Sequence, residues 1–263
     1  MQDTNYLIRQ LPLKDMGEAL LTMEIINRAE YLGFDAPIKM ALRLAAYLHR
    51  DQLRSNRGSL PRDTYITHPL RNTLRLMRWG VTDLFTLQAS LLHDTIEDCS
   101  EDIVDNIAVT VLADRAPITI RTAALEYLHF EFGPEVSQIV AAVSNPLADE
   151  NAPRLSKEAK REEYRANVKI KTEKAKPAVV KLADLVDNGS GLKHNTGMVD
   201  AARWHLANKY VGTMEDFLVR LRQPDMIVLL SPSGFEQAQT AIISGISDLR
   251  VLISELETTN GDN

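Results

Sequence analysis

Apolar residues recur at helical spacing in nearly every segment of the chain. Spacings of three and four residues place such side chains on one face of a helix. The alternating apolar and polar runs typical of strands are few, so the pattern predicts an all-α protein. Two early examples of the helical pattern are Leu20, Met23, Ile26 and Ala29, and then Leu42, Ala45, Ala46 and Leu48.

Capping and breaking residues divide this pattern into separate helices. Thr82 and Ser100 are expected to be N-caps, so the helix that carries His93 should end near Cys99. Proline suits the first turn of a helix, and glycine or a polar residue before proline suits its end. Later boundaries are therefore expected at Gly133-Pro134, at Ser144-Asn145-Pro146 and at Pro177, which should open a helix that carries Asp184.

The chain of 263 residues fits one domain with a C-terminal appendage. The segment SNRGSLPRDTY (55–65) is expected to be a loop beside the site. QPDMIVLLSPSG should interrupt the helices, and a helical pattern resumes from 234 to 256. We expect a single domain over residues 1–256 with a core at about 36–220, a C-terminal helical extension, and a disordered tail over 257–263.

Composition narrows the class of protein. The only cysteine is Cys99, so no intramolecular disulfide can form, and neither a signal sequence nor a bilayer-length uncharged stretch is present. These features predict a cytoplasmic protein with no membrane association. A net charge of −6 argues against a nucleic-acid partner. Residues 154–181 carry a net charge of +6, with ten basic and four acidic residues, which is typical of a solvated helix face.

Two histidines and two aspartates stand out as a candidate ligand set for one divalent metal ion: His68, the adjacent His93-Asp94, and Asp184. Two neutral imidazoles and two carboxylates balance a divalent charge and leave coordination positions open. The acids that follow Asp94 would repel one another without a cation. The other histidines have ordinary structural or surface explanations, although His49 shares a helix with Gln52 and Arg54 and could lie near the site.

A mononuclear metal site with open positions suits hydrolysis of a phosphate ester, because the ion acidifies bound water and polarises a phosphoryl oxygen. Glu97 and Asp98 follow the His93-Asp94 pair and are candidates for orienting or deprotonating the attacking water. The competing interpretation is a pair of surface acids near a helix C-terminus, where the helix dipole would disfavour them slightly.

Four segments in a fixed order resemble a known family: AAYLHRDQLR (45–54), YITHPL (65–70), QASLLHDTIED (88–98) and VKLADLVDN (180–188). They resemble the HD-domain metal phosphohydrolases, and within that family the hydrolase domain of RelA/SpoT-type enzymes. The similarity is greater to the stand-alone small alarmone hydrolases, and it implies an HD-domain helical bundle.

The resemblance also implies roles for individual residues. It makes the two histidines and two aspartates the ligands of one Mn²⁺, and Glu97 and Asp98 the catalytic acids. It implies that the substrate is a small-molecule nucleotide. Substrate contacts would be Arg54 at the base, Tyr65 near the nucleotide, Asn188 at the ribose, and Lys157, Lys160 and Arg161 at the pyrophosphate.

The implied reaction removes the 3′-pyrophosphate of guanosine tetraphosphate or pentaphosphate and returns GDP or GTP. Some features depart from the family pattern. The longer loop allows Arg57 or Arg62 in place of Arg54, Asp187 stands where histidine or tyrosine is usual, and Gly189 and Gly191 could end the helix early. An HD phosphohydrolase for another nucleotide, including adenosine alarmones, and an antitoxin-like binding module remain alternatives. Formation of a homo-oligomer is left open.

Overall fold

The all-α prediction is confirmed. The computed structural model describes residues 7–8, 10–54, 62–107, 119–145, 155–195 and 197–261, and every regular element in these ranges is helical. Extended backbone pairing within them is confined to an isolated bridge between Leu53 and Thr64. No helix in these ranges combines the length and the apolar character needed to cross a membrane.

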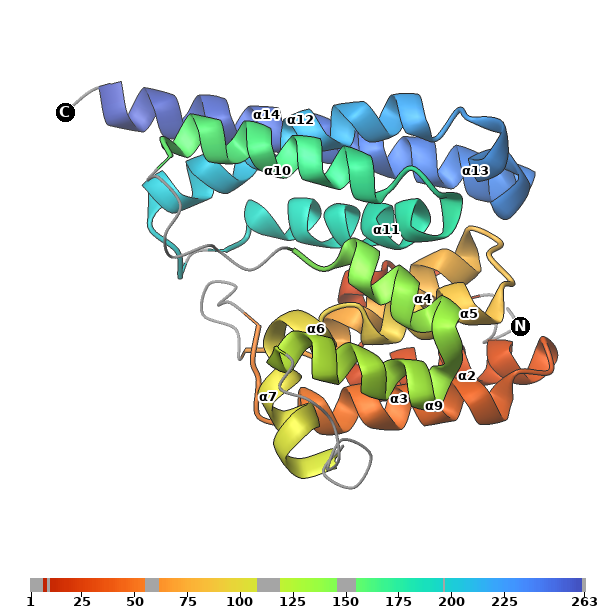
Figure 1. Cartoon of the computed structure of the whole chain (residues 1–263). Coiled ribbons are helices and arrows are strands. Elements are labelled where there is room, and N and C mark those ends of the chain that lie inside the picture. Colours follow the sequence, from red (N-terminus) through yellow and green to blue (C-terminus); the bar gives the residue numbers. More distant parts are fainter. Residues whose placement is uncertain are drawn as a thin grey trace.

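The N-terminal half of the chain forms one layer of helices, seen in the lower part of Figure 1. A 3-10 turn, η1, precedes this layer, and a π-helical turn, η2, follows its short helices. In chain order the elements are η1 (Leu13–Asp15), α2 (Glu18–Tyr31), α3 (Asp35–Leu48), α4 (Thr67–Arg78), α5 (Leu84–Leu92), α6 (Thr95–Asp98), α7 (Ser100–Asp102), η2 (Ile103–Ile107) and α9 (Ile120–Val143).

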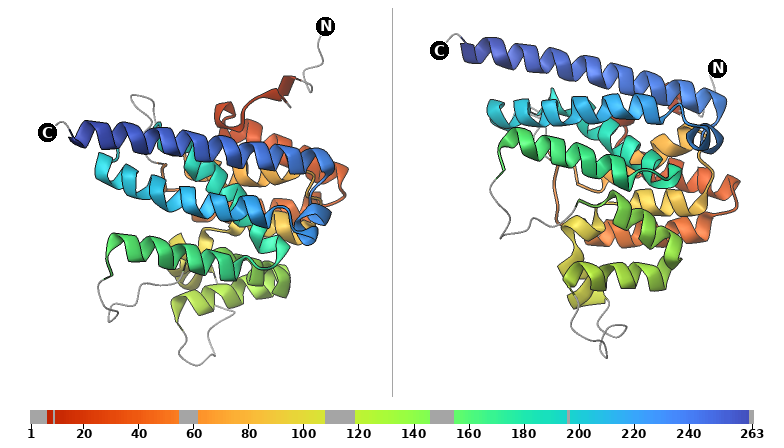
Figure 2. Two further views of the ribbon diagram at one scale, coloured as in Figure 1. Left: turned by 90° about the horizontal axis from the view of Figure 1, so that it is seen from above. Right: turned by 45° about the horizontal axis from the view of Figure 1, so that its top comes forward.

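The C-terminal half forms a second layer above the first (Figures 1 and 2). Within it α12 and α14 run antiparallel along one another, and α14 ends far from the N-terminus. Its elements are α10 (Lys157–Lys171), α11 (Ala175–Leu192), α12 (Asp200–Arg220), α13 (Pro224–Leu229) and α14 (Pro232–Gly261).

The hydrophobic core is continuous between the two layers. Helix α11 packs against α4, α5 and α9 on one side and against α12 and α14 on the other. Its residues from Pro177 to Asp187 are all buried, as is nearly every residue of α4. Because both helices are enclosed on all sides, their polar side chains must find partners inside the protein. The candidate metal ligands lie in this buried region between the two layers.

Gly234, at the start of α14, holds the two layers close together. A Cβ atom at this position would lie 1.7 Å from the carbonyl oxygen of Trp79, at the end of α4. The neighbouring Ser231 amide donates a hydrogen bond to the same oxygen at 3.0 Å. Only glycine allows this approach of the two backbones.

Two of the predicted boundaries near the site are wrong. Asp83 rather than Thr82 caps α5, since its carboxylate accepts the Thr86 amide at 2.9 Å. Ser100 does not cap a helix, because its hydroxyl donates back to the Ile96 carbonyl at 2.6 Å. The predicted helix through His93 is also interrupted. It ends at Leu92, and the Thr95 hydroxyl occupies the Leu92 carbonyl that a continuing helix would use.

The later boundaries follow the prediction more closely. Gly133 has φ of 86° and kinks α9, which then ends before Ser144. Helix α11 begins at Ala175, two residues before Pro177, and runs through both of its glycines to Leu192. The helix continues through Gly189, where an added Cβ atom would lie 3.4 Å from Leu249 and 3.5 Å from Met214. Helix α14 continues to Gly261, so residues 257–261 are helical where we expected disorder.

Candidate metal centre and adjoining pocket

The four predicted metal ligands converge between the two layers. His68 comes from the first turn of α4, His93 and Asp94 from the turn between α5 and α6, and Asp184 from the middle of α11. One ligand atom from each of His68, His93 and Asp94 lies within 4.8 Å of the others. Oδ1 of Asp184 is 3.1 Å from Nε2 of His68 and 3.8 Å from Nε2 of His93.

Hydrogen bonds set the tautomers of both histidines. Nδ1 of His93 faces the Ser90 carbonyl at 2.9 Å, and Nδ1 of His68 faces Oδ2 of Asp187 at 2.8 Å. Both partners only accept, so each Nδ1 donates and each neutral ring carries its lone pair on Nε2. These Nε2 atoms lie 3.5 Å and 3.1 Å from the same Asp94 oxygen, Oδ2.

In the metal cluster formed by His68, His93, Asp94 and Asp184, hydrogen-bond acceptors therefore face one another. Nε2 of His93 is buried and makes no hydrogen bond to any described group. Inward-facing imidazole and carboxylate atoms suit a divalent cation, which would satisfy all of them together. The donor set fits one divalent metal ion.

Charge holds both aspartates ionised. Burial would raise the pKa of Asp184, but Lys181 and the two histidines outweigh it and place that pKa well below the ordinary value. The pKa of Asp94 is likewise lowered, against its burial, by His93 and His68. In return, the two carboxylates raise the pKa of His93 despite the desolvation of its ring. A bound cation would take the place of these protons.

Hydrogen bonds from neighbouring side chains also hold the two carboxylates in place. The Tyr65 hydroxyl donates to Oδ2 of Asp94 at 2.7 Å. Lys181 donates to Oδ2 of Asp184 at 2.9 Å, and Asn188 donates to Oδ1 of Asp184 at 2.6 Å. Burial lowers the pKa of Lys181, but Asp184 reverses this and keeps the ammonium charged. Orientation of ligands by such partners tunes a metal site.

The two predicted catalytic acids lie at the edge of the cluster in different environments. Both oxygens of Glu97 accept from the Nδ2 group of Asn145, at 3.2 and 2.9 Å, and the Asn145 amide adds a bond of 2.7 Å. Asp98 lies at the surface and its side chain is exposed. Desolvation by the neighbouring protein, together with the charges of Asp94 and Glu97, nevertheless raises its pKa to about 6. Asn145 was considered only as a helix stop in the sequence.

The bridge between Leu53 and Thr64 positions two of the predicted substrate contacts. The Arg54 amide donates to the Asp63 carbonyl, and the Tyr65 amide donates to the Gln52 carbonyl, both at 2.9 Å. The Arg54 guanidinium carbon then lies 5.4 Å from the centre of the Tyr65 ring. This pairing places Arg54 and Tyr65 side by side next to the metal cluster.

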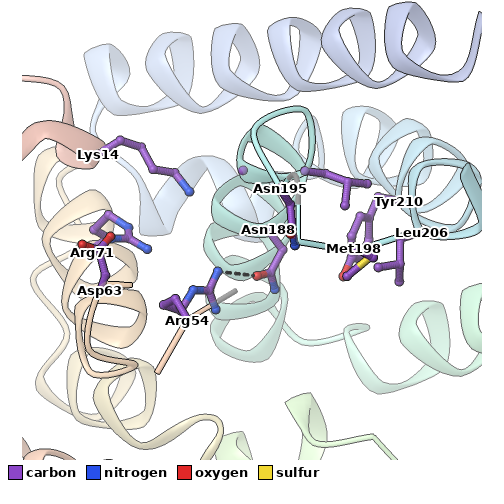
Figure 3. Close-up of a pocket in the computed structure, with 11 residues that line it drawn as sticks. Lys14, Arg54, Asp63, Arg71, Asn188, Asn195, Met198, Leu206 and Tyr210 are labelled. Carbon is purple, nitrogen blue, oxygen red and sulfur yellow. Dashed lines mark hydrogen bonds between the residues drawn. The ribbon is translucent and has the colours of Figure 1, made fainter. Parts of the chain in front are cut away.

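A pocket of about 150 Å³ adjoins the cluster on this side. In Figure 3 Arg54 and Asn188 point toward one another across it, joined by a hydrogen bond of 3.1 Å. Lys14 and Arg71 line the pocket as well, and sequence reasoning missed both. The other lining residues are Asp63, Gly191, Leu192, Asn195, Met198, Leu206 and Tyr210.

The structure bears on the three arginines considered for base recognition. Arg54 lines the pocket. Arg62 turns back onto the chain and donates to the carbonyls of Arg54 and Leu53, at 2.7 and 3.3 Å. Arg57 lies outside the described residues. Of the two described arginines, only Arg54 lines the pocket.

The predicted cationic contacts lie on the first turns of α10. Lys157 and Lys160 are exposed there, and Arg161 contacts α12, with Nη1 3.2 Å from Nδ1 of His205 and its guanidinium over Trp204. Different lysines lie near the acids of the cluster: Lys171, Lys181 and Lys209 all interact electrostatically with Glu97.

Lys209 in particular is enclosed. Its Nζ lies 3.6 Å from the centre of the Tyr164 ring, and burial followed by the charge of Lys181 lowers its pKa. Nothing in the sequence separates Lys171 and Lys209 from the other lysines of α10 and α12, because their proximity to Glu97 depends on how the two layers meet.

Comparison with known proteins agrees with this geometry. The guanosine-3′,5′-bis(diphosphate) 3′-pyrophosphohydrolase MESH1 of Xenopus tropicalis is 31% identical over 163 residues, which cover 61% of this chain and 72% of that protein. The mouse MESH1 protein is 29% identical over 124 residues, 46% of this chain and 53% of that protein.

A bacterial relative is much longer than the region that it shares. The guanosine-3′,5′-bis(diphosphate) 3′-pyrophosphohydrolase of Vibrio cholerae is 29% identical over 179 residues, which cover 67% of this chain and 19% of that protein. No protein-family model matches the chain. The extent of similarity to the frog protein, together with the all-helical fold and the buried histidine-aspartate cluster, shows that the chain belongs to the HD-domain alarmone hydrolase family.

Proposed function

We propose that this protein is a Mn²⁺-dependent hydrolase that removes the 3′-pyrophosphate of guanosine tetraphosphate or pentaphosphate, giving GDP or GTP and pyrophosphate. The observation that carries the proposal is the hydrogen-bonded chain Arg54–Asn188–Asp184. It connects Arg54, which lines the pocket, through Asn188 to a candidate metal ligand.

The pocket side of this chain suits the nucleoside. A planar guanidinium stacks on flat aromatic groups, and the Arg54 guanidinium already lies over the Tyr65 ring. A base packed on Arg54 would place its ribose at the Asn188 amide. Because Asn188 also contacts Asp184, the 3′ substituent would then extend toward the metal cluster.

The far side of the cluster suits a pyrophosphate. Lys181 is charged and buried beside Asp184, and Lys171 and Lys209 lie close enough to Glu97 to sense its charge. Cations fixed in an enclosed site stabilise phosphoryl oxygens more strongly than they do in water. Lys157, Lys160 and Arg161 remain candidates for contacts to the outer phosphate.

His68, His93, Asp94 and Asp184 would hold the ion, which supplies acidified water and a polarised phosphoryl oxygen. Water would attack the phosphorus attached to the 3′ oxygen, the bond between them would break, and the 3′ oxygen would take a proton. Asp98, with a pKa of about 6, is ionised at neutral pH and can accept the proton of the water. Glu97, clamped by Asn145, can orient the same water.

The test is product analysis of metal-free protein with and without Mn²⁺. Substrates are guanosine tetraphosphate, its adenosine counterpart and a deoxynucleoside triphosphate. We expect Mn²⁺-dependent release of pyrophosphate and GDP, lost in Asp94→Ala. The matched control is Asp216→Ala, which removes an aspartate from an Arg165 ion pair away from the cluster and should stay active.

Other outcomes assign other functions. Cleavage of the adenosine tetraphosphate alone would assign adenine, not guanine, as the base that the pocket accepts. Cleavage of the triphosphate alone assigns the protein to another HD phosphohydrolase activity. If the protein binds a nucleotide tightly but does not cleave it in the presence of any metal ion, the result supports the alternative of a binding module.

A further inference from the structure

Asp187 forms the most heavily charged contact network next to the metal cluster, and no proposed step uses it. It lies one helical turn after Asp184 on α11 and is fully buried. Arg71 donates to both of its oxygens, at 2.9 and 3.0 Å, and Arg75 donates to Oδ1 at 3.2 Å. Nδ1 of His68 donates to Oδ2 at 2.8 Å.

Such a network needs a reason beyond stability. Removing a carboxylate and two guanidinium groups from water is costly, and well-packed apolar side chains of similar volume often stabilise a protein as well or better. Of the contacts that Asp187 makes, the one to His68 reaches a candidate metal ligand. Its geometry therefore indicates what the network does.

The His68 ring has polar partners on both sides, and the shorter contact is the one at Nδ1. The Asp187 carboxylate can only accept from Nδ1. On the other side Nε2 lies 3.1 Å from Oδ1 of Asp184 and 3.4 Å from the Asn72 amide nitrogen, which can only donate. The Asn72 amide is itself oriented, since its oxygen accepts from Arg75 at 2.8 Å. Arg75 thus contacts both groups that fix the ring.

We propose that Asp187 is a positioning residue for the metal ion, which holds His68 as the Nδ1–H tautomer with the Nε2 lone pair directed at Asp94 and Asp184. Arg71 and Arg75 hold its carboxylate in place. The two histidine ligands then differ, because His93 donates to a neutral carbonyl and His68 to a carboxylate. A carboxylate partner raises the basicity of a metal-binding imidazole.

The N-terminal part of the chain contacts the same group. Lys14, in η1, donates to the Asp187 carbonyl at 2.8 Å, and its Nζ is 3.3 Å from Oδ1. Lys14 and Arg71 also line the pocket beside Arg54, as Figure 3 shows. Asp187 therefore joins the metal cluster, the pocket and a segment that precedes the family motifs.

The experiment measures Mn²⁺ affinity, not turnover. Metal-free protein is titrated with Mn²⁺, and free ion is quantified by its electron paramagnetic resonance signal. We expect Asp187→Asn to raise the Kd for Mn²⁺ by about 10- to 100-fold, the usual effect of losing a partner of a ligand. Asp216→Asn is the matched control, since its bidentate pair with Arg165, at 2.6 and 2.7 Å, lies away from His68.

A merely structural role gives a different result. A folded Asp187→Asn protein with a lowered Tm and a Kd within twofold of wild type overturns the proposal. Where Asp187→Asn does not fold, the double variant with Arg75→Gln removes one charge of each sign and is expected to show the same loss of affinity.

A measurement on the unmodified protein needs no variant to fold. Nitrogen-15 NMR of the imidazoles, with Zn²⁺ as a diamagnetic ion and His68→Gln for assignment, reports the tautomer. We expect Nδ1–H for His68, and Nε2–H overturns the proposal.

The inference rests on the metal site of the proposed function but not on its substrate. If the wild-type protein does not cleave the tetraphosphate but Asp187→Asn loses Mn²⁺ affinity, the proposed substrate is wrong and the inference about Asp187 stands. Absence of Mn²⁺ binding to the wild-type protein refutes the inference and the metal dependence together.

Discussion

The Tyr65 hydroxyl allows a single hydrogen bond to a metal ligand to be removed. It donates to Oδ2 of Asp94 at 2.7 Å, the oxygen that faces both histidines. Burial and the charge of Asp94 raise the pKa of Tyr65, so the hydroxyl stays protonated and remains a donor. Tyr65→Phe keeps the ring, which packs 4.8 Å from the His49 ring and beneath Arg54.

Two consequences follow from losing this bond. A hydrogen bond to a charged group contributes about 1.5–3 kcal/mol, and the buried Asp94 oxygen would be left with less compensation. We expect metal-free Tyr65→Phe to lose about 1.5–3 kcal/mol of unfolding free energy. The Asp94 carboxylate also becomes free to rotate, and we expect Mn²⁺ affinity to fall about tenfold, at the lower end for a partner of a ligand.

The assay combines urea unfolding of the metal-free protein with a Mn²⁺ titration. Tyr31→Phe is the matched control, because Tyr31 is 91% exposed and removal of its hydroxyl should change neither quantity. Lower stability with an unchanged Kd would show that the hydroxyl stabilises the fold and does not orient a ligand. No change in either quantity would refute the reasoning from the hydrogen bond.

Three further predictions follow from the same cluster. Mn²⁺ at one hundred times its Kd should raise the free energy of unfolding by about 2.7 kcal/mol, and this gain should be absent in Asp94→Ala in the same melts. The pKa of Asp98 is raised to about 6, so its folded form retains a proton that the unfolded chain releases, and stability falls as pH rises from about 4 to 6. Asp98→Asn should therefore stabilise the metal-free protein above pH 6, by at most about 1 kcal/mol because the carboxylate is exposed, and it should abolish turnover. Urea unfolding measures this stability, and an equal dependence on pH in the two proteins would contradict the prediction. Lys209→Met should raise the KM for guanosine tetraphosphate about tenfold, which is the magnitude of one charged hydrogen bond, and Lys160→Met should raise it less. Steady-state kinetics measures both values. The reverse order would favour Lys157, Lys160 and Arg161 of α10 as the contacts to the pyrophosphate.

The sequence alone determined the class of fold and the candidate ligands of the metal site. Helical spacing is a local property, so the all-helical fold and the kink at Gly133 could be predicted from neighbouring residues. Ligand chemistry is also local to each side chain. His68, His93, Asp94 and Asp184 could therefore be selected as one set before their convergence was known, because histidine and aspartate in recognisable motifs carry that chemistry wherever the chain places them.

Tertiary structure decided what supports that chemistry. Arg71 and Asp187 are 116 residues apart, and Asn145 and Glu97 are 48 apart. Nothing local pairs them. Asp187 does share a helical face with Asp184, but that spacing does not reveal that His68 lies opposite. Lysines on a helix surface are ordinarily solvated, and only the packing of α12 against α11 brings Lys209 toward Glu97. Burial gives these contacts their strength, and burial exists only once the two layers meet.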